Sequence, residues 1–190
     1  MNNISPFIVY LISVNISAFL LVLVNKYAKK SFFDIIITIF AFIGGSLGAI
    51  LGILIFDRKP EKENMLSRIL IICILIIQIA ITLLIKGKHP DGLNFNIIAF
   101  FKENLFFLCY LVLINIMTLI AFGMDKYYAV KSKSRIPIIA LIGISAFGGT
   151  IGGLLGMYIF KHKTTKNYFS IGLRVILFTQ LIVLFYIMNI

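Results

Sequence analysis

The side chains best suited to chemistry in this chain are a few charged and amide groups at the ends of, or inside, long apolar runs. Asp34 and Asp125 lie near basic residues, so each can form an ion pair. Asn15 and Asn115 lie ten or eleven residues before the end of an apolar run. An amide in such surroundings needs a partner, either another helix or a bound solute. These patterns indicate binding or helix packing.

Support for an enzyme is weak. His89 and His162 are far apart in the sequence, and neither has the spacing of metal ligands. No nucleophile can be assigned a neighbouring base, and phosphate loops and dinucleotide fingerprints are absent. Cys73 and Cys109 lie inside apolar runs, which argues against a disulfide framework. We expect no metal, no cofactor and no catalytic residue, and enzyme activity is an unfavoured alternative.

The composition indicates an integral membrane protein. Of the 190 residues, 61% are hydrophobic and only 13% are charged, which is too few for the surface of a soluble domain. Strand-like alternation is absent, so helices must satisfy the backbone inside the bilayer. The formal net charge of +11 is distributed in short clusters between the apolar runs. Contact with anionic lipid headgroups therefore explains the charge better than nucleic acid does.

Six apolar runs are long enough to cross about 30 Å of hydrocarbon as helices. The first is expected to be retained, because it lacks the basic segment and cleavage motif of a signal peptide. The longest connection contains a Pro-Asp-Gly turn signal, and its later part is either a short interfacial helix or a lead-in to the next run. The expected spans are about 6–24, 33–56, 66–85, 105–124, one within 137–166, and 168–188.

The two halves of the chain match each other at polar and glycine positions, which leucine-rich similarity alone does not explain. The offset is 100 residues before the glycine run and 104 within it. We expect a degenerate first repeat at 1–88, a connecting loop at 89–104, and a second repeat at 105–190. The matched pairs are Tyr10/Tyr110, Asn15/Asn115, Asn25/Asp125, Lys26/Lys126, Gly44/Gly148, Gly48/Gly152, Gly52/Gly156, Phe56/Phe160, Lys59/Lys163 and, at an offset of 102, Gln78/Gln180.

Each half has three expected spans, which is an odd number. The second half would then enter the membrane from the opposite side, as in transporters built from inverted repeats. With this topology the basic residues divide almost evenly between the two faces and leave the orientation undetermined. The predicted fold class is therefore all-α, a polytopic membrane protein whose six transmembrane helices form two inverted three-helix repeats.

The second half resembles a known family at specific residues. These are Asn115, the Phe-Gly-Met-Asp-Lys sequence that ends at Lys126, the Arg-Ile-Pro that ends at Pro137, the glycine run, and Phe-Lys-His-Lys-Thr from Phe160. This part, from Tyr110 to about Gln180, is similar to the bacterial membrane-protein family called domain of unknown function 1294. The first half resembles a degraded second copy. The resemblance implies a membrane location and no established activity.

The departures from the family pattern are informative. Where the resemblance implies a glutamate the chain has Ile138, which aligns with Asp34 in the first half, and Arg135 aligns with a serine. A basic residue usual in the family is Ser170 here, with Arg174 one helical turn later. The first half thus has the acidic residue, Asp34, and the second half has the basic residue, Arg135. We expect the two halves to share one charged network.

The glycines of the two central runs recur every four residues and predict a smooth groove on one helix face. The favoured interpretation is close packing of the second and fifth spans against each other, with a substrate path as the alternative. A broken or re-entrant helix is an open alternative but is not required, because each run is long enough to cross. The helix-packing glycines are Gly44, Gly48, Gly52, Gly148, Gly152 and Gly156.

Polar residues near the span ends are the candidate substrate-binding groups. In the inverted topology, Asp125, Lys126 and Arg135 gather on one face with Arg58 and Lys59. On the other face Asn25, Lys26 and Asp34 meet His162 and Lys163. Boundary lysines have an alternative role as headgroup anchors. The candidates are Asn15, Asn115, Asp34, Asp125, Lys126, Arg135, His162, Lys163 and Arg174.

The sequence favours a small transporter, channel or lipid translocase in a bacterial cytoplasmic membrane, with a site at the repeat interface. One alternative is a non-catalytic membrane partner that stabilises or regulates another complex. Another is a membrane-embedded enzyme that acts on a lipid. Membrane lipids, including anionic headgroups, are the expected partners, and a homodimer or a second membrane protein stays open.

Overall fold

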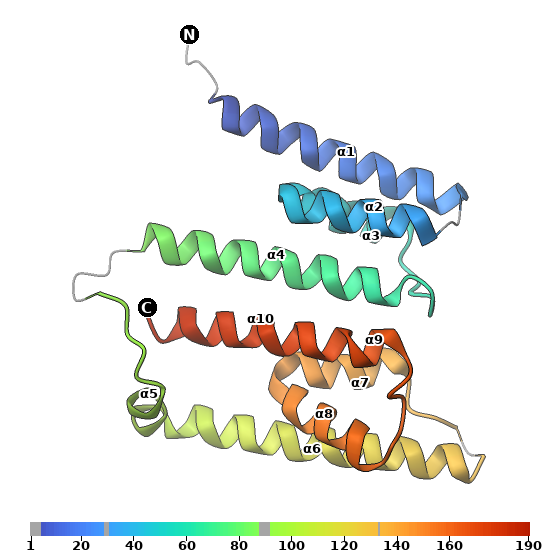
Figure 1. Cartoon of the computed structure of the whole chain (residues 1–190), viewed down its shortest axis with the longest axis vertical. Coiled ribbons are helices and arrows are strands. Elements are labelled where there is room, and N and C mark those ends of the chain that lie inside the picture. The colour runs from blue at the N-terminus through green and yellow to red at the C-terminus, as the bar shows by residue number, and fades with distance from the viewer. Residues whose placement is uncertain (1–4, 29–30, 88–91, 133) are drawn as a thin grey trace. The chain divides into compact units, whose positions relative to one another are not determined.

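The computed structural model describes residues 5–28, 31–87, 92–132 and 134–190, and within these ranges every regular element is a helix (Figure 1). The chain divides into two compact units, Met1–Ile79 and Ala80–Ile190. Two five-residue segments, η1 (Ala41–Gly45) and η2 (Ser145–Gly149), interrupt the helices. The helices are α1 (Pro6–Ala28), α2 (Ser31–Phe40), α3 (Ser46–Phe56), α4 (Met65–Lys86), α5 (Ile97–Glu103), α6 (Leu105–Val130), α7 (Ile138–Ile144), α8 (Thr150–Ile159), α9 (Asn167–Ser170) and α10 (Gly172–Ile187).

The predicted all-α membrane architecture is confirmed. Six helical segments of the described residues have the length and hydropathy needed to cross a bilayer, and they coincide with the six apolar runs. The segments are Pro6–Ala28, Phe32–Phe56, Met65–Lys86, Leu105–Val130, Ile138–Ile159 and Asn167–Ile187.

The second and fifth of these segments are broken near their middle. Gly44 has φ +110° and Gly148 has φ +113°, in the left-handed region that glycine adopts at the least cost. The breaks separate α2 from α3 and α7 from α8 (Figure 1). The second helix of each pair has 11 or 10 residues. Its length is about 15 Å, only half of a hydrocarbon core.

Contacts with the preceding helix establish that each broken segment folds back on itself. The backbone N–H of Ile136, just before α7, donates to the Asp125 carboxylate at 3.1 Å. His162, just after α8, contacts the same carboxylate at 2.9 Å. Both ends of the segment therefore lie at the C-terminal end of α6. In the first unit, Asn25 of α1 bonds Asp34 of α2 and lines one pocket with the end of α3.

Each unit thus contains a helical hairpin, with its tip at η1 or η2 and its mouth where the chain enters and leaves it. The helices that follow run away from the mouth. In the first unit Arg68, near the start of α4, pairs with Asp57 at the mouth. In the second, Arg174 near the start of α10 donates to Tyr158 of α8, and Asn189 beyond its end bonds Asn94, which precedes α6.

This geometry differs from the straight second and fifth helices that the sequence predicted. A hairpin enters and leaves at one end of its unit, so only α1 and α4, or α6 and α10, run from one end to the other. The error arose because the broken segments are long and apolar enough to cross. Length and hydropathy do not distinguish a straight helix from two half-length helices. The inverted repeat rested on three straight spans in each half, so the geometry within the units gives it no support.

An asparagine on the first helix of each unit bonds the hairpin tip. The Asn15 side chain donates to the carbonyl of Gly44 at 2.9 Å and accepts from the backbone N–H of Gly48 at 2.7 Å. It also donates to the carbonyl of Leu11 in its own helix. The second unit repeats the two tip bonds at the equivalent residues, Asn115, Gly148 and Gly152.

A tyrosine and a glutamine complete the bonding of each tip. The Tyr10 hydroxyl donates to the carbonyl of Ile43 at 2.7 Å, and the Gln78 amide donates to the carbonyls of Ala41 and Phe42 at 2.9 and 3.2 Å. The break therefore leaves these carbonyls bonded, as backbone at membrane depth must be. In the second unit the equivalent donors are Tyr110, bonded to Phe147, and Gln180, bonded to Ser145 and Ala146.

The later glycines bring each hairpin against the first helix of its own unit. A Cβ at Gly48 would overlap the backbone of Asn15, and a Cβ at Gly52 would lie 2.9 Å from the Val22 side chain. The sequence paired the second and fifth spans with each other, whereas these contacts are made with α1. Gly44 and Gly148 belong to the break, so they are not part of a continuous groove. In the second unit the glycines and their neighbours on α6 are Gly152 with Asn115 and Gly156 with Phe122.

Replacing Gly148 by alanine should destabilise the protein. A left-handed φ costs about 1–2 kcal/mol for an L-residue, and the new Cβ would lie 3.0 Å from Leu111. Gly143→Ala is the matched control, because a Cβ there meets nothing within 4 Å. Thermal unfolding in detergent should show a lower midpoint for Gly148→Ala alone. Equal midpoints for the two variants would be incompatible with the break.

Candidate functional site

Charged residues gather at the mouths of the two hairpins, and in the second unit they form a closed cluster. The Asp125 side chain has no solvent exposure. Its carboxylate contacts the Lys163 ammonium at 2.7 Å, the His162 Nε2 at 2.9 Å and the backbone N–H of Ile136 at 3.1 Å. A buried carboxylate is tolerated only when it is paired and hydrogen-bonded in this way.

The turn after α8 positions the two basic side chains. Lys161 and Lys163 have φ of +47° and +62°, a conformation that costs a non-glycine residue free energy. The Lys163 ammonium also lies 4.7 Å from the centre of the buried Phe169 ring, a cation–π contact. The ion pair with Asp125 and this ring contact offset the strain and hold the turn against α6.

The hairpin mouth of the first unit contains different side chains at the equivalent positions. Asn25 stands at the position of the second unit's buried aspartate, and its Nδ2 donates to the Asp34 carboxylate at 2.8 Å. The Asn25 Oδ1 is buried and has no hydrogen-bond partner within the described residues. Nearby, the Asp57 carboxylate accepts from Arg68 at 2.6 Å and from Asn64 at 3.2 Å.

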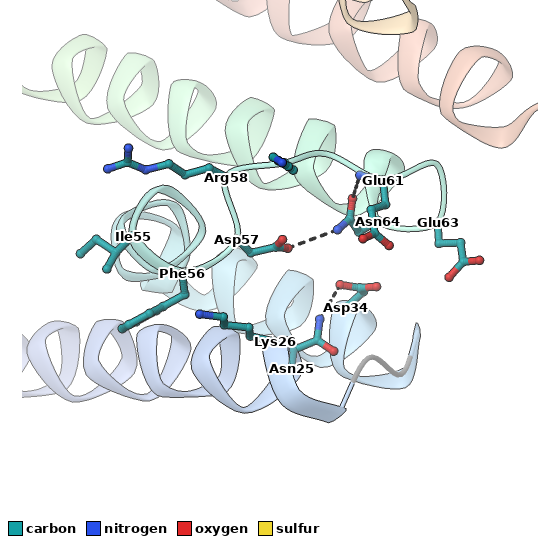
Figure 2. A pocket seen from close by; sticks show the side chains of 11 residues that line it. Asn25, Lys26, Asp34, Ile55, Phe56, Asp57, Arg58, Glu61, Glu63 and Asn64 are labelled. Carbon is teal, nitrogen blue, oxygen red and sulfur yellow. Dashed lines mark hydrogen bonds between the residues drawn. The ribbon is translucent and has the colours of Figure 1, made fainter.

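A pocket of about 430 Å³ opens at this mouth. Figure 2 shows Asn25, Asp34, Asp57 and Asn64 around it, contributed by α1, α2 and the connection from α3 to α4. Four carboxylate residues and two amides therefore line one space, since Glu61 and Glu63 also border it, and three basic residues complete its polar lining. Among the described residues no group of three His, Cys, Asp or Glu side chains is placed to hold a metal ion.

The predicted amides lie at the tips and not in the pocket. Asn15 and Asn115 each use both amide protons and the carbonyl oxygen in bonds to backbone groups of their own unit. These bonds hold the hairpin tip against the first helix of its unit, which is a structural role. A solute could reach these amides only by replacing those bonds.

The predicted charge clusters need correction. The sequence placed His162 and Lys163 on the face opposite Asp125, but both contact this residue, because the hairpin returns to the face from which it entered. Arg135 is exposed and Lys126 is half-buried. Arg174 is exposed and donates to the Tyr158 hydroxyl at 2.8 Å. Of the nine candidates, the structure brings together Asp125, His162 and Lys163.

Sequence reasoning missed the residues that close the first mouth, namely Asp57, Asn64 and Arg68. Their signal was present, since the loop 57–64 is rich in charges and directly follows the broken segment. Tyr10 and Tyr110 were recognised as matched positions but were given no role. A hydroxyl at the same place in both repeats, inside an apolar run, was the available clue.

These features define an all-helical membrane protein in which each unit contains a helical hairpin whose tip is hydrogen-bonded to the first helix of that unit. A family model described as "Protein of unknown function (DUF1294)" matches residues 115–169. The "Uncharacterized protein YsdA" of Bacillus subtilis (strain 168) is 37% identical over 75 residues, which is 40% of this chain and 84% of that protein. The chain therefore belongs to the DUF1294 family. No solved structure matches it.

Asp125→Asn should destabilise the second unit strongly. Removing one partner of a buried ion pair typically costs about 3–5 kcal/mol, because the other charge is left uncompensated. Thermal unfolding in detergent measures this loss, with Glu103→Gln on the exposed surface of α5 as the charge-matched control. An Asp125→Asn protein as stable as the control would show that the ion pair is not formed.

Proposed function

We propose that the protein is a small transporter, channel or lipid translocase of the bacterial cytoplasmic membrane, and that its substrate enters at the hairpin mouths. The observation that carries this proposal is the pair of hairpins that end at membrane depth. Irregular backbone at that depth occurs where protein buries it or where it lines a solute path. Broken helices of this kind form the binding sites of many transporters.

The proposed topology places both halves in the same orientation. If α1, α4, α6 and α10 cross the bilayer and the hairpins do not, each half begins and ends on one side, and both mouths face the other. Basic residues favour the cytoplasmic side, so the mouths are assigned to the cytoplasm. The side opposite the mouths then carries only Lys86, Lys88 and Lys102 of the 18 basic residues. The mouth side carries Lys26, Lys29, Lys30, Arg58, Lys59, Lys62, Arg68, Lys126, Lys131, Lys133, Arg135, Lys161, Lys163, Lys166 and Arg174.

The comparison with the Bacillus protein supports this topology. The match of 75 residues accounts for 84% of that protein, so the Bacillus protein is about as long as one half of this chain. Tandem duplication of a unit whose ends lie on one side gives two copies in one orientation without any inversion.

The second candidate function is a non-catalytic membrane partner that stabilises or regulates another complex. The specific observation in its favour is the apolar character of the hairpin tips. Their carbonyls are bonded within each unit, and Phe42 and Phe147 are 68% and 74% exposed. An exposed aromatic side chain at each tip suits contact with lipid or with an apolar helix better than contact with a polar solute.

Cysteine labelling in intact cells tests the topology. In a Cys73→Ser/Cys109→Ser background, we expect Lys131→Cys and Lys166→Cys to be shielded from a membrane-impermeant thiol reagent. Lys102→Cys should react, because it lies on the external side. The inverted topology predicts instead that Lys166 and Lys102 share a side and Lys131 lies opposite. All three positions are solvent-exposed, so accessibility reports topology rather than burial.

Flux through reconstituted protein tests the function. Liposomes with the wild-type protein should move at least one of a monovalent cation, an anionic metabolite or a fluorescent phospholipid. Gln180→Leu removes the donor to two tip carbonyls, so it should reduce that flux, whereas Gly143→Ala should retain it. Folded protein that moves nothing in this panel contradicts transport, and a stable heteromeric complex after purification then supports the partner role.

A further inference from the structure

We propose that the first-unit pocket binds a zwitterionic aminophosphate group, supplied by the headgroup of an aminophospholipid such as phosphatidylethanolamine or by a free phosphoamine. This proposal goes beyond transport, because such a site can be occupied in a protein that moves nothing. It rests on the difference between the two mouths and on the arrangement of opposite charges around the pocket.

The second unit shows what the first unit lacks. There the Lys163 ammonium lies 2.7 Å from the buried Asp125. At the equivalent place Lys59 is exposed, and Arg58 is exposed and donates its Nε hydrogen to the carbonyl of Leu54. The first unit's own side chains therefore leave the position of the cation open, and a pocket of about 430 Å³ lies there.

The acceptors in the pocket suit an ammonium group. Asp34 bonds the amide of Asn25, and no ion pair to it is formed within the described residues. The buried Oδ1 of Asn25 lacks a donor there as well. A primary ammonium has three donors. A ligand ammonium can therefore bond both the Asp34 carboxylate and the Asn25 Oδ1. In the second unit, the Lys163 ammonium pairs with the Asp125 carboxylate in a similar way.

The rest of the lining suits a phosphate and the start of an acyl chain. Lys26, Arg58 and Lys59 line the same pocket, and each can donate charge-assisted hydrogen bonds to phosphate oxygens. Ile55 and Phe56 add an apolar wall. The pocket follows the end of α3 at the level of the hairpin mouth, where a span meets the interface. Glu61 and Glu63 line the pocket as well, so it offers groups of both signs, which suits a zwitterionic headgroup better than a purely anionic one.

Binding by the purified full chain in detergent separates the possible ligands. Native mass spectrometry would compare phosphatidylethanolamine, phosphatidylglycerol and phosphatidylcholine, and titration with free phosphoethanolamine would test the soluble source. We expect preference for phosphatidylethanolamine, because phosphatidylglycerol lacks the ammonium and a quaternary ammonium cannot donate. Stronger binding of free phosphoethanolamine than of the lipid supports the same site chemistry with a soluble ligand. Equal binding of the three lipids overturns the proposal.

Two variants test the assigned contacts. Asp34→Asn should weaken phosphatidylethanolamine binding about tenfold, the loss expected for one charge-assisted hydrogen bond. Lys59 lies on the exposed rim of the pocket, so we expect Lys59→Gln to fold as the wild type does and to weaken binding of the phosphate end by a smaller factor. Glu103→Gln on α5 is the matched control and should bind as the wild type does. Unchanged binding in folded Lys59→Gln and Asp34→Asn would overturn the assignment.

Discussion

The structure depends on the satisfaction of backbone groups at the tip of each hairpin. Breaking a helix inside a bilayer exposes carbonyl and N–H groups that water cannot reach, and each unpaired group costs several kcal/mol. Asn15 and Asn115 pair such groups in their own units. In each unit the asparagine amide bonds the carbonyl of the glycine at the break and the N–H of the glycine four residues later. The close approach this requires is possible only because Gly48 and Gly152 have no Cβ. In each unit, the hydrogen bonds at the tip therefore require both the asparagine and the glycine.

Folding back has consequences at the other end of each unit. Because the chain returns to the face from which it entered, the residues before and after the hairpin meet at the end of the preceding helix. Ile136 and His162 are 26 positions apart in the sequence, and because of this return both contact the Asp125 carboxylate. The same return concentrates basic residues at the mouths, where loops before and after the hairpin lie together. A straight fifth helix would separate the two groups by the thickness of the bilayer.

Much of the fold could be predicted from the sequence, because hydropathy and length determine which segments enter a membrane. The matched polar positions also located the residues that now form the tips. The break could not be predicted in this way, since Gly44 and Gly148 share the spacing of the packing glycines and differ from them only in φ. The adjacent pairs, Gly44-Gly45 and Gly148-Gly149, were the only local signal. Once each hairpin was taken as one straight helix, its two ends were assigned to opposite faces, and His162 and Lys163 were placed away from Asp125.

The two units show how one scaffold can carry two different mouths. The tip bonds are the same in both, so the hairpin itself is not where the copies differ. They differ where an aspartate in the second unit is an asparagine in the first, and where His162 corresponds to Arg58. Removing the buried acid removes the reason for a lysine to fold inward, because the ammonium would lose its ion pair on leaving water. The lysine then stays in solvent and the space stays open. The change of charge at the end of the first helix and the change from His162 to Arg58 therefore distinguish a closed structural cluster in one unit from an accessible polar pocket in the other.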